Sequence, residues 1–144
     1  SYLLNPIEAA VDVTGYAGNK AKTKVYQRAW NGALSFIGGE WMGNQIRFKT
    51  RNFGSFVLAE DVTKPSISPI KVNAQGMRFT IKDNLSGIKS FEAFVNGEWV
   101  LMRYEHKQDV IWSESMNGQS LKGTAILKVT DQAGNVAEWR GTLN

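Results

Sequence analysis

Residues 77–104 constrain the fold more than any other part of the sequence. Apolar and polar residues alternate over 77–82, and a period of two is typical of a half-buried β-strand. Aromatic and branched residues over 88–95 predict a second strand. Asn96-Gly97 then offers the two positive-φ positions that a tight hairpin turn needs, so 98–104 is predicted to return as a third strand. We therefore expect an antiparallel meander within an all-β fold.

Short strands of the same kind recur along the whole chain. Turn-forming pairs such as Asn31-Gly32 separate them, and no segment shows the 3.6-residue apolar period of a helix over three turns. A strand is predicted at 110–115, followed by a loop that the turn pairs Asn117-Gly118 and Lys122-Gly123 bound. About seven short strands over 67–143, with turns every ~8–12 residues, indicate a β-sandwich.

The segment 60–69 divides the chain into two parts. Its sequence, EDVTKPSISP, combines two prolines with several turn formers. Pro65 favours extended backbone at the residue before it, as linkers require. We expect residues 1–63 to form one β-sandwich module that is truncated or short of a full strand set, and residues 64–144 to form a seven-stranded module.

The composition excludes several classes of function. The chain of 144 residues has no cysteine, and therefore no disulfide, thiol nucleophile or cysteine-based metal site. Its net charge of +4 is spread without a basic stripe, and the densest patch, Lys20, Lys22 and Lys24, is interpreted as a solvated loop, which argues against a nucleic-acid partner. No apolar run approaches the ~20 residues that span a bilayer. The chain opens abruptly at Ser1, so we expect a processed chain or an excised piece of a longer protein.

Candidate catalytic residues are few. His106 is the only histidine, and we interpret it as an ordinary exposed side chain because zinc sites need three or four ligands. The 13 acidic residues show no pair of the kind that glycoside hydrolysis uses. We therefore predict no catalytic residue, no metal site and no cofactor, and expect that this chain is not itself an enzyme.

Two groups of turn residues offer oxygen ligands for calcium. One group is Asp83, Asn84 and Ser86, and the other is Asp131 and Asn135. Their spacing does not match the EF-hand, and calcium takes six or more oxygens. Asp and Asn also close turns by hydrogen bonding to nearby backbone, and this structural interpretation is favoured.

The five tryptophans are the remaining candidates for a ligand surface. Trp30 and Trp112 are the least constrained by the surrounding pattern, so they are the candidate ligand-binding residues. Trp41 and Trp99 follow Gly-Glu turns, and Trp139 lies in phase with a strand face, which predicts packing for these three.

Several turn motifs resemble those of known bacterial modules. VTDQAGNV at 129–136 resembles the closing strands of many bacterial immunoglobulin-like modules. DNLSGI at 83–88, followed by NGEWV at 96–100, resembles the C-terminal module of bacterial cell-envelope zinc peptidases of the lysostaphin type. The preceding module of that group carries Gly-Gly-x-Trp, Phe-Gly-x-Phe and Asp-x-x-x-Pro, found here at 38–41, 53–56 and 61–65. The resemblance covers roughly residues 24–144.

The resemblance implies two tandem immunoglobulin-like β-sandwich modules with an accessory role. It implies a non-catalytic spacer or surface-binding region of an extracytoplasmic bacterial protein, the C-terminal region of a peptidoglycan metallopeptidase. Its partners would be the upstream catalytic domain of the same polypeptide and a cell-wall or surface glycan. The zinc ligands of that family, a His and an Asp followed by a His-x-His pair, have no counterpart in this sequence. The alternative is a carbohydrate-binding module that uses Trp30 and Trp112, and a free-standing hydrolase ranks third.

Overall fold

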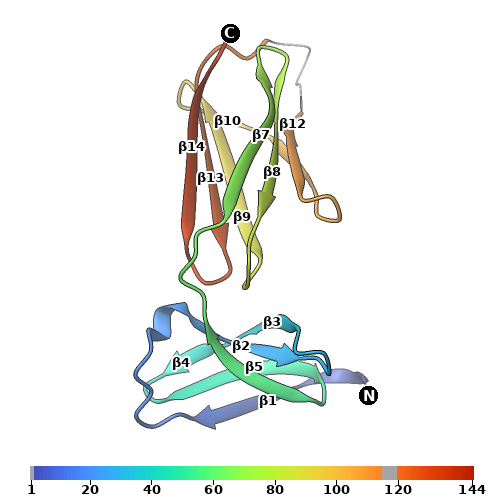
Figure 1. Ribbon diagram of the computed structural model, residues 1–144, viewed down its shortest axis with the longest axis vertical. Helices are drawn as coiled ribbons and strands as arrows, with labels where there is room; N and C mark the ends of the chain where they lie inside the picture. The colour runs from blue at the N-terminus through green and yellow to red at the C-terminus, as the bar shows by residue number, and fades with distance from the viewer. Residues whose placement is uncertain (1, 115–119) are drawn as a thin grey trace. The chain divides into compact units, whose positions relative to one another are not determined.

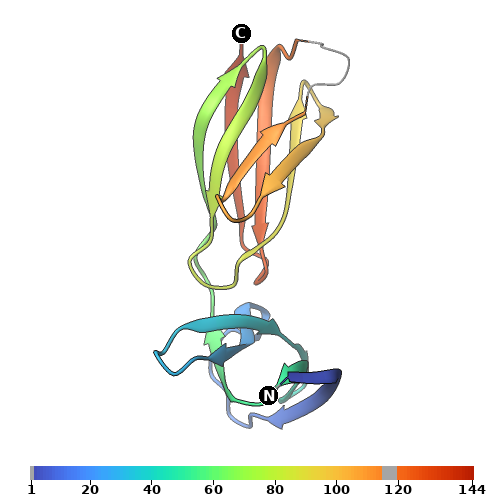
Figure 2. The same cartoon turned by 90° about the vertical axis from the view of Figure 1, so that its right-hand side faces the viewer.

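The chain is built almost entirely of β-strands, which confirms the predicted fold class (Figures 1 and 2). The computed structural model describes residues 2–114 and 120–144, so the predicted turn at Asn117-Gly118 lies outside the described residues. A single short 3-10 helix, η1 (Lys20–Lys22), occurs among them. No helix with the length and apolarity needed to cross a bilayer is present in this part of the chain. The chain divides into two compact units, Ser1–Val62 and Thr63–Asn144.

Unit 1 contains two three-stranded antiparallel sheets, ordered β1-β5-β4 and β3-β2-β6. Its strands are β1 (Tyr2–Asp12), β2 (Thr23–Arg28), β3 (Leu34–Gly38), β4 (Glu40–Met42), β5 (Gln45–Asn52) and β6 (Ser55–Glu60). Gly39 alone separates β3 from β4, with a φ of 119° that is strained for any residue with a side chain. Because of this glycine, the chain passes from one sheet to the other without a loop.

The core of unit 1 is small. Val25 from β2 is buried together with Ile46 and Phe48 from β5. Half-buried Ile37 and Phe56 pack against this cluster. Two small sheets thus share one apolar interior, which leaves most other side chains of the unit in contact with water.

Unit 2 contains eight strands in two four-stranded antiparallel sheets. The strands are β7 (Ser66–Asn73), β8 (Gly76–Lys82), β9 (Ile88–Val95), β10 (Glu98–Val100), β11 (Met102–Glu105), β12 (Val110–Ser113), β13 (Gly123–Asp131) and β14 (Val136–Leu143). Their order is β10-β9-β13-β14 in one sheet and β11-β12-β8-β7 in the other. The prediction of seven strands for this region was therefore one too few.

The meander predicted over 77–104 is wrong, although its strands exist. β8 and β9 lie in different sheets, and the segment 98–104 is two strands instead of one. β10 pairs with β9, whereas β11 pairs with β12, and Leu101 between them is where the chain crosses from one sheet to the other. Alternation in the sequence reports one buried face per strand. In a sandwich, a strand shows this alternation whichever of the two sheets it belongs to. The alternation therefore did not reveal that the chain crosses between the sheets.

The core of unit 2 is formed by inward-facing residues of both sheets. Phe79 and Ile81 from β8, and Leu127 and Val129 from β13, are fully buried in one cluster. The ring of Trp139 on β14 lies edge-on to Phe79 with the centroids 4.9 Å apart, which is a favourable aromatic geometry. The predicted packing role of Trp139 is confirmed.

The turn between β13 and β14 is built around the buried side chain of Asp131. Its Oδ1 accepts hydrogen bonds from the backbone N–H groups of Ala133 (2.9 Å) and Asn135 (2.8 Å), and its Oδ2 accepts one from the Asn135 side-chain amide (2.8 Å). Gly134 has a φ of 85°, which confirms the prediction of a left-handed residue between two paired strands. Asp131 and Gly134 together close the last hairpin of the unit.

Replacement of Gly134 by valine is expected to destabilise unit 2 by more than ~1 kcal/mol, because a branched side chain is strained at this positive φ. Thermal unfolding followed by circular dichroism measures the change. Gly134→Asn is the matched control, since asparagine tolerates left-handed backbone, and it should retain most of the stability. Identical melting curves for Gly134→Val and the wild type would contradict the assignment.

Candidate functional site

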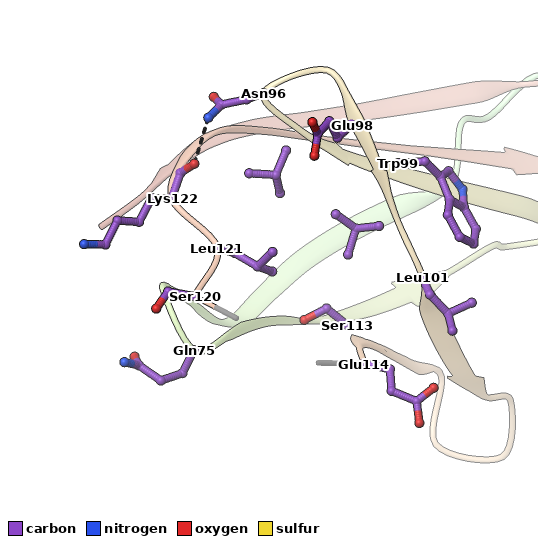
Figure 3. A pocket seen from close by; sticks show the side chains of 12 residues that line it. Gln75, Asn96, Glu98, Trp99, Leu101, Ser113, Glu114, Ser120, Leu121 and Lys122 are labelled. Atoms are coloured by element: carbon purple, nitrogen blue, oxygen red, sulfur yellow. Dashed lines mark hydrogen bonds between the residues drawn. The ribbon is translucent and has the colours of Figure 1, made fainter. Parts of the chain in front are cut away.

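A hollow of about 420 Å³ lies in unit 2, between the β9–β10 turn and the segment that leads into β13 (Figure 3). Its volume falls within the ~300–1,000 Å³ of typical small-molecule sites. The lining residues come from the ends of several strands and from the turns between them: Gln75, Val95, Asn96, Glu98, Trp99, Val100, Leu101, Ser113, Glu114, Ser120, Leu121 and Lys122.

One wall of the hollow is held by the side chain of Asn96. Asn96 and Gly97 form the predicted hairpin turn with φ values of 52° and 80°. The Asn96 amide donates to the Lys122 carbonyl oxygen (2.9 Å), and its Oδ1 accepts from the Thr124 N–H (2.9 Å), as Figure 3 shows for the first of these bonds. Gly123 lies between them with a φ of 120°, and a methyl group there would collide with the Asn96 side chain. A residue that looks like a local turn former in the sequence thus fixes a second segment 26 residues away.

Backbone hydrogen bonds hold the other walls. The Leu121 N–H donates to the Ala74 carbonyl oxygen (2.8 Å), which ties the segment before β13 to the β7–β8 turn. The Glu114 N–H donates to the Leu101 carbonyl oxygen (3.0 Å) at the sheet crossing. The backbone segments that line the hollow are therefore held in place by hydrogen bonds, so their side chains project from a pre-organised backbone.

Trp99 is the main aromatic side chain of the hollow, and its predicted packing role is wrong. It is 61% exposed. It lies on β10, a three-residue strand that, among the described residues, is at the edge of its sheet and pairs with β9, with Trp99 opposite Phe94. Because β10 is an edge strand beside the hollow, no sheet covers the Trp99 indole. The local sequence does not distinguish such an edge position from a packed one.

The remaining lining combines apolar and polar groups. Val100, Leu101 and Leu121 supply partly buried apolar surface. Exposed Glu98 and Gln75 supply carboxylate and amide groups on different sides of the hollow in the view of Figure 3. The Trp99 indole lies beside a few polar groups that accept and donate hydrogen bonds. This combination suits a polar ligand with apolar ring faces.

The two tryptophans predicted to bind ligand lie in different units. Trp30 is in the β2–β3 turn of unit 1 and is 98% exposed, which agrees with the prediction of a displayed side chain. Trp112 in unit 2 is only half-buried, and the Arg78 guanidinium carbon lies 5.5 Å from the centre of its ring. Arg78 is the direct cross-strand partner of Trp112 in the β8–β12 ladder. Arg78 therefore makes a cation–π contact with the half-buried Trp112 ring, and the ligand-binding role of Trp112 stays a prediction.

Trp41 packs as predicted. Its ring stacks on Tyr16 with the centroids 5.4 Å apart, and its Nε1 donates a hydrogen bond to the Thr23 carbonyl oxygen at 3.0 Å. The ammonium group of Lys20 lies 5.3 Å from the ring centre. These contacts satisfy both the apolar body and the polar tip of this indole.

The two groups of possible calcium ligands are brought together in unit 2. Carboxylate oxygens of Asp83 and Asp131 come within 4.8 Å of each other. Asp83 Oδ2 accepts from the N–H of Gly87 (2.8 Å), and the Gln132 N–H donates to the Gly87 carbonyl oxygen (2.9 Å), which joins the two turns. These hydrogen bonds, with those to Asp131, support turn closure. Calcium takes six to eight oxygen ligands, so the carboxylates of these two turns do not by themselves make up a calcium site.

His106 is exposed, as predicted, and its nearest aromatic partner is Tyr104, with the ring centroids 6.2 Å apart. Tyr104 is half-buried on β11 and also lies edge-on to Phe91 at 5.5 Å. Burial raises the pKa of the Tyr104 phenol above its usual value, and the negative charge of Asp109 raises it further.

Comparisons with known proteins leave the function open. No family model matches the chain, and no curated protein matches it. Among solved structures, the apo form of an expansin from Clavibacter michiganensis matches with 12% sequence identity and a TM-score of 0.43, over 95% of this chain and 76% of the expansin chain. At this level of similarity, the match assigns neither a function nor a ligand.

Tyr104 is expected to ionise at a higher pH than an ordinary tyrosine, whose pKa is about 10. The protonated phenol is favoured in the folded state, so its contribution to stability is complete below pH ~10 and is lost as the pH rises through the raised pKa. Alkaline ultraviolet titration of the wild type minus Tyr104→Phe isolates this phenol. Asp109→Asn should lower its pKa part of the way back, whereas an ordinary titration of Tyr104 in the wild type would contradict its burial.

Proposed function

We propose that this chain is a non-catalytic, surface-binding accessory region of an extracytoplasmic bacterial protein. Within that role, the resemblance of its turn motifs supports placement at the C-terminal end of a peptidoglycan metallopeptidase. Its ligand is a cell-wall glycan, bound in the hollow beside Trp99. The upstream catalytic domain of the same polypeptide is its covalent partner.

The turn motifs support this proposal because they form structural elements here. Residues 131–135 close the β13–β14 hairpin, and Asn96-Gly97 closes β9–β10. Residues 38–41 contain the glycine that joins the two sheets of unit 1. The resemblance thus rests on residues that serve the fold, so it supports the kind of module, while the ligand is argued from the hollow.

The observation that carries the binding role is the exposed Trp99 on the rim of a pre-organised hollow. An indole that is 61% exposed at an edge strand leaves apolar surface in contact with water. The ring faces of pyranose sugars present C–H groups that cover such a plate, while Glu98 and Gln75 are placed to bond sugar hydroxyl or amide groups. This arrangement favours Trp99 over Trp112 as the carbohydrate contact, because Arg78 already covers Trp112.

Replacement of Trp99 by alanine is expected to weaken binding of soluble, β-1,4-linked amino-sugar oligosaccharides by about 2 kcal/mol, or roughly 30-fold, as for a central aromatic anchor. Isothermal titration calorimetry of the whole chain measures the affinity. Trp30→Ala is the matched control, since Trp30 belongs to unit 1, and it should bind like the wild type. Equal affinities for Trp99→Ala and the wild type, or no binding by the wild type, would refute the site.

The purified chain is expected neither to bind zinc stoichiometrically nor to hydrolyse peptidoglycan, peptides or glycosides. The sequence has one histidine and no cysteine, so it offers few of the groups that activate water or a nucleophile. Incubation with peptidoglycan and chromatography of the soluble products measures hydrolysis. Reproducible product release that His106→Ala abolishes would overturn the non-catalytic assignment.

A further inference from the structure

We propose that unit 1 carries a second binding surface, independent of the hollow in unit 2, that rests on an anionic lipid surface. This surface consists of Trp30 and Phe53 with Arg28 and Arg51, and we call it the aromatic tip. The chain would lie against the membrane at this tip without crossing it.

The first aromatic residue of the tip is displayed by a closed turn. The N–H of Gly32 donates to the Ala29 carbonyl oxygen (3.0 Å), and the N–H of Ala29 donates to the Ala33 carbonyl oxygen (2.8 Å). The Asn31 side chain accepts a further bond from the Ala33 N–H (3.0 Å). Trp30 lies inside this bonded loop, at the end of the β2–β3 hairpin that extends outward from unit 1 in Figure 2. The backbone at Trp30 is thus held in place while its side chain stays in water.

The second aromatic residue lies at the same end of the sheet. Phe53 is in the turn between β5 and β6, and the register of β2 with β6 ends at the pair Arg28 and Ser55. Gly54 lies close against β2, since a methyl group on it would be 2.9 Å from the Gln27 side-chain nitrogen. The two turns therefore sit at one end of the β2–β6 ladder, each with an exposed aromatic residue.

Both aromatic side chains of the tip are strongly exposed. Trp30 is 98% exposed, the highest value among the large hydrophobic side chains of the described residues, and Phe53 is 62% exposed. Two bulky aromatic residues that are exposed on adjacent turns favour an apolar partner.

Positive charge accompanies the aromatic pair. Arg28 ends β2 just before Trp30, and Arg51 precedes Phe53 by two residues; both side chains are exposed. Acidic residues are absent from the two segments 27–35 and 49–56 that make up these turns and their flanks. Arginine beside tryptophan is the composition of surfaces that contact lipid headgroups, since the guanidinium binds phosphate while the indole enters the interface.

The display of Trp30 favours a lipid surface over a glycan. A sugar ring covers one face of an indole, whereas almost the entire surface of Trp30 is exposed. The headgroup and upper acyl region surrounds an inserted side chain on all sides, so it removes more of that surface from water. Trp30 and Phe53 need no contact with each other to bind lipid, because both side chains can enter the same membrane surface.

Sedimentation of the whole chain with vesicles of phosphatidylglycerol and phosphatidylcholine tests the proposal. The wild type should bind these vesicles at least about tenfold more strongly than vesicles of phosphatidylcholine alone. Trp30→Ser with Phe53→Ser should lower binding by at least about tenfold. Arg28→Gln with Arg51→Gln should lower it by about 25-fold in low salt, on the basis of about fivefold for each arginine, and should flatten the salt dependence.

Matched controls remove similar groups from unit 2. Trp99→Ser with Ile70→Ser removes exposed apolar side chains, and Lys71→Gln with Lys89→Gln removes the same charge; both should bind vesicles like the wild type. Circular dichroism establishes that each variant is folded. Equal binding to both vesicle types, absence of binding, or equal losses in the controls would refute the proposal.

A soluble polyanion separates lipid from other acidic partners. If polyglutamate competes fully and the aromatic double variant binds vesicles like the wild type, the tip is a binding site for acidic polymers and the lipid proposal fails. The effect of Trp99→Ala on oligosaccharide binding is measured separately from vesicle binding. A negative result for the glycan site is therefore distinguishable from a negative result for the aromatic tip.

Discussion

Burial of one face of every strand against a facing sheet is the constraint on which unit 2 depends. Phe79 and Ile81 on one sheet and Leu127 and Val129 on the other are removed from water only when both sheets are present. Burial of each such side chain contributes on the order of 1.5–3 kcal/mol. Because the inner faces are used in this way, side chains available for a ligand lie at sheet edges, in turns and on outer faces.

Tryptophan shows how position decides the role of one residue type. Trp139 lies on a strand that another sheet faces, and it packs on Phe79. Trp112 is covered by its cross-strand neighbour Arg78. Trp99 on a short edge strand and Trp30 in a turn have no such cover, and they are the two tryptophans with exposed side chains. Each of the two proposed surfaces is therefore built around an indole that the fold did not bury.

Polar side chains that bond to backbone groups hold both proposed surfaces in place. Asn96 joins its own turn to the segment at Lys122, and Asn31 closes the turn that carries Trp30. A turn that is already ordered loses little conformational freedom when it binds, and this lowers the entropic penalty of association. The same kind of bond, made by Asp131, closes the last hairpin.

Local sequence was sufficient for most strands and for several turns because their causes are local. Alternation over 77–82 reports a buried face, and Asn96-Gly97 and Gly134 are needed where the backbone adopts positive φ. Sheet membership, the crossing at Leu101, and the meeting of the turns at Asp83 and Asp131 depend on segments far apart in the chain. Exposure of Trp99 depends in turn on which strand is at the edge. The sequence by itself thus determined the all-β class and the turn positions. Only the tertiary structure decided which side chains remain uncovered, because burial is set by the neighbouring strand and facing sheet, and a one-dimensional pattern does not specify either of them.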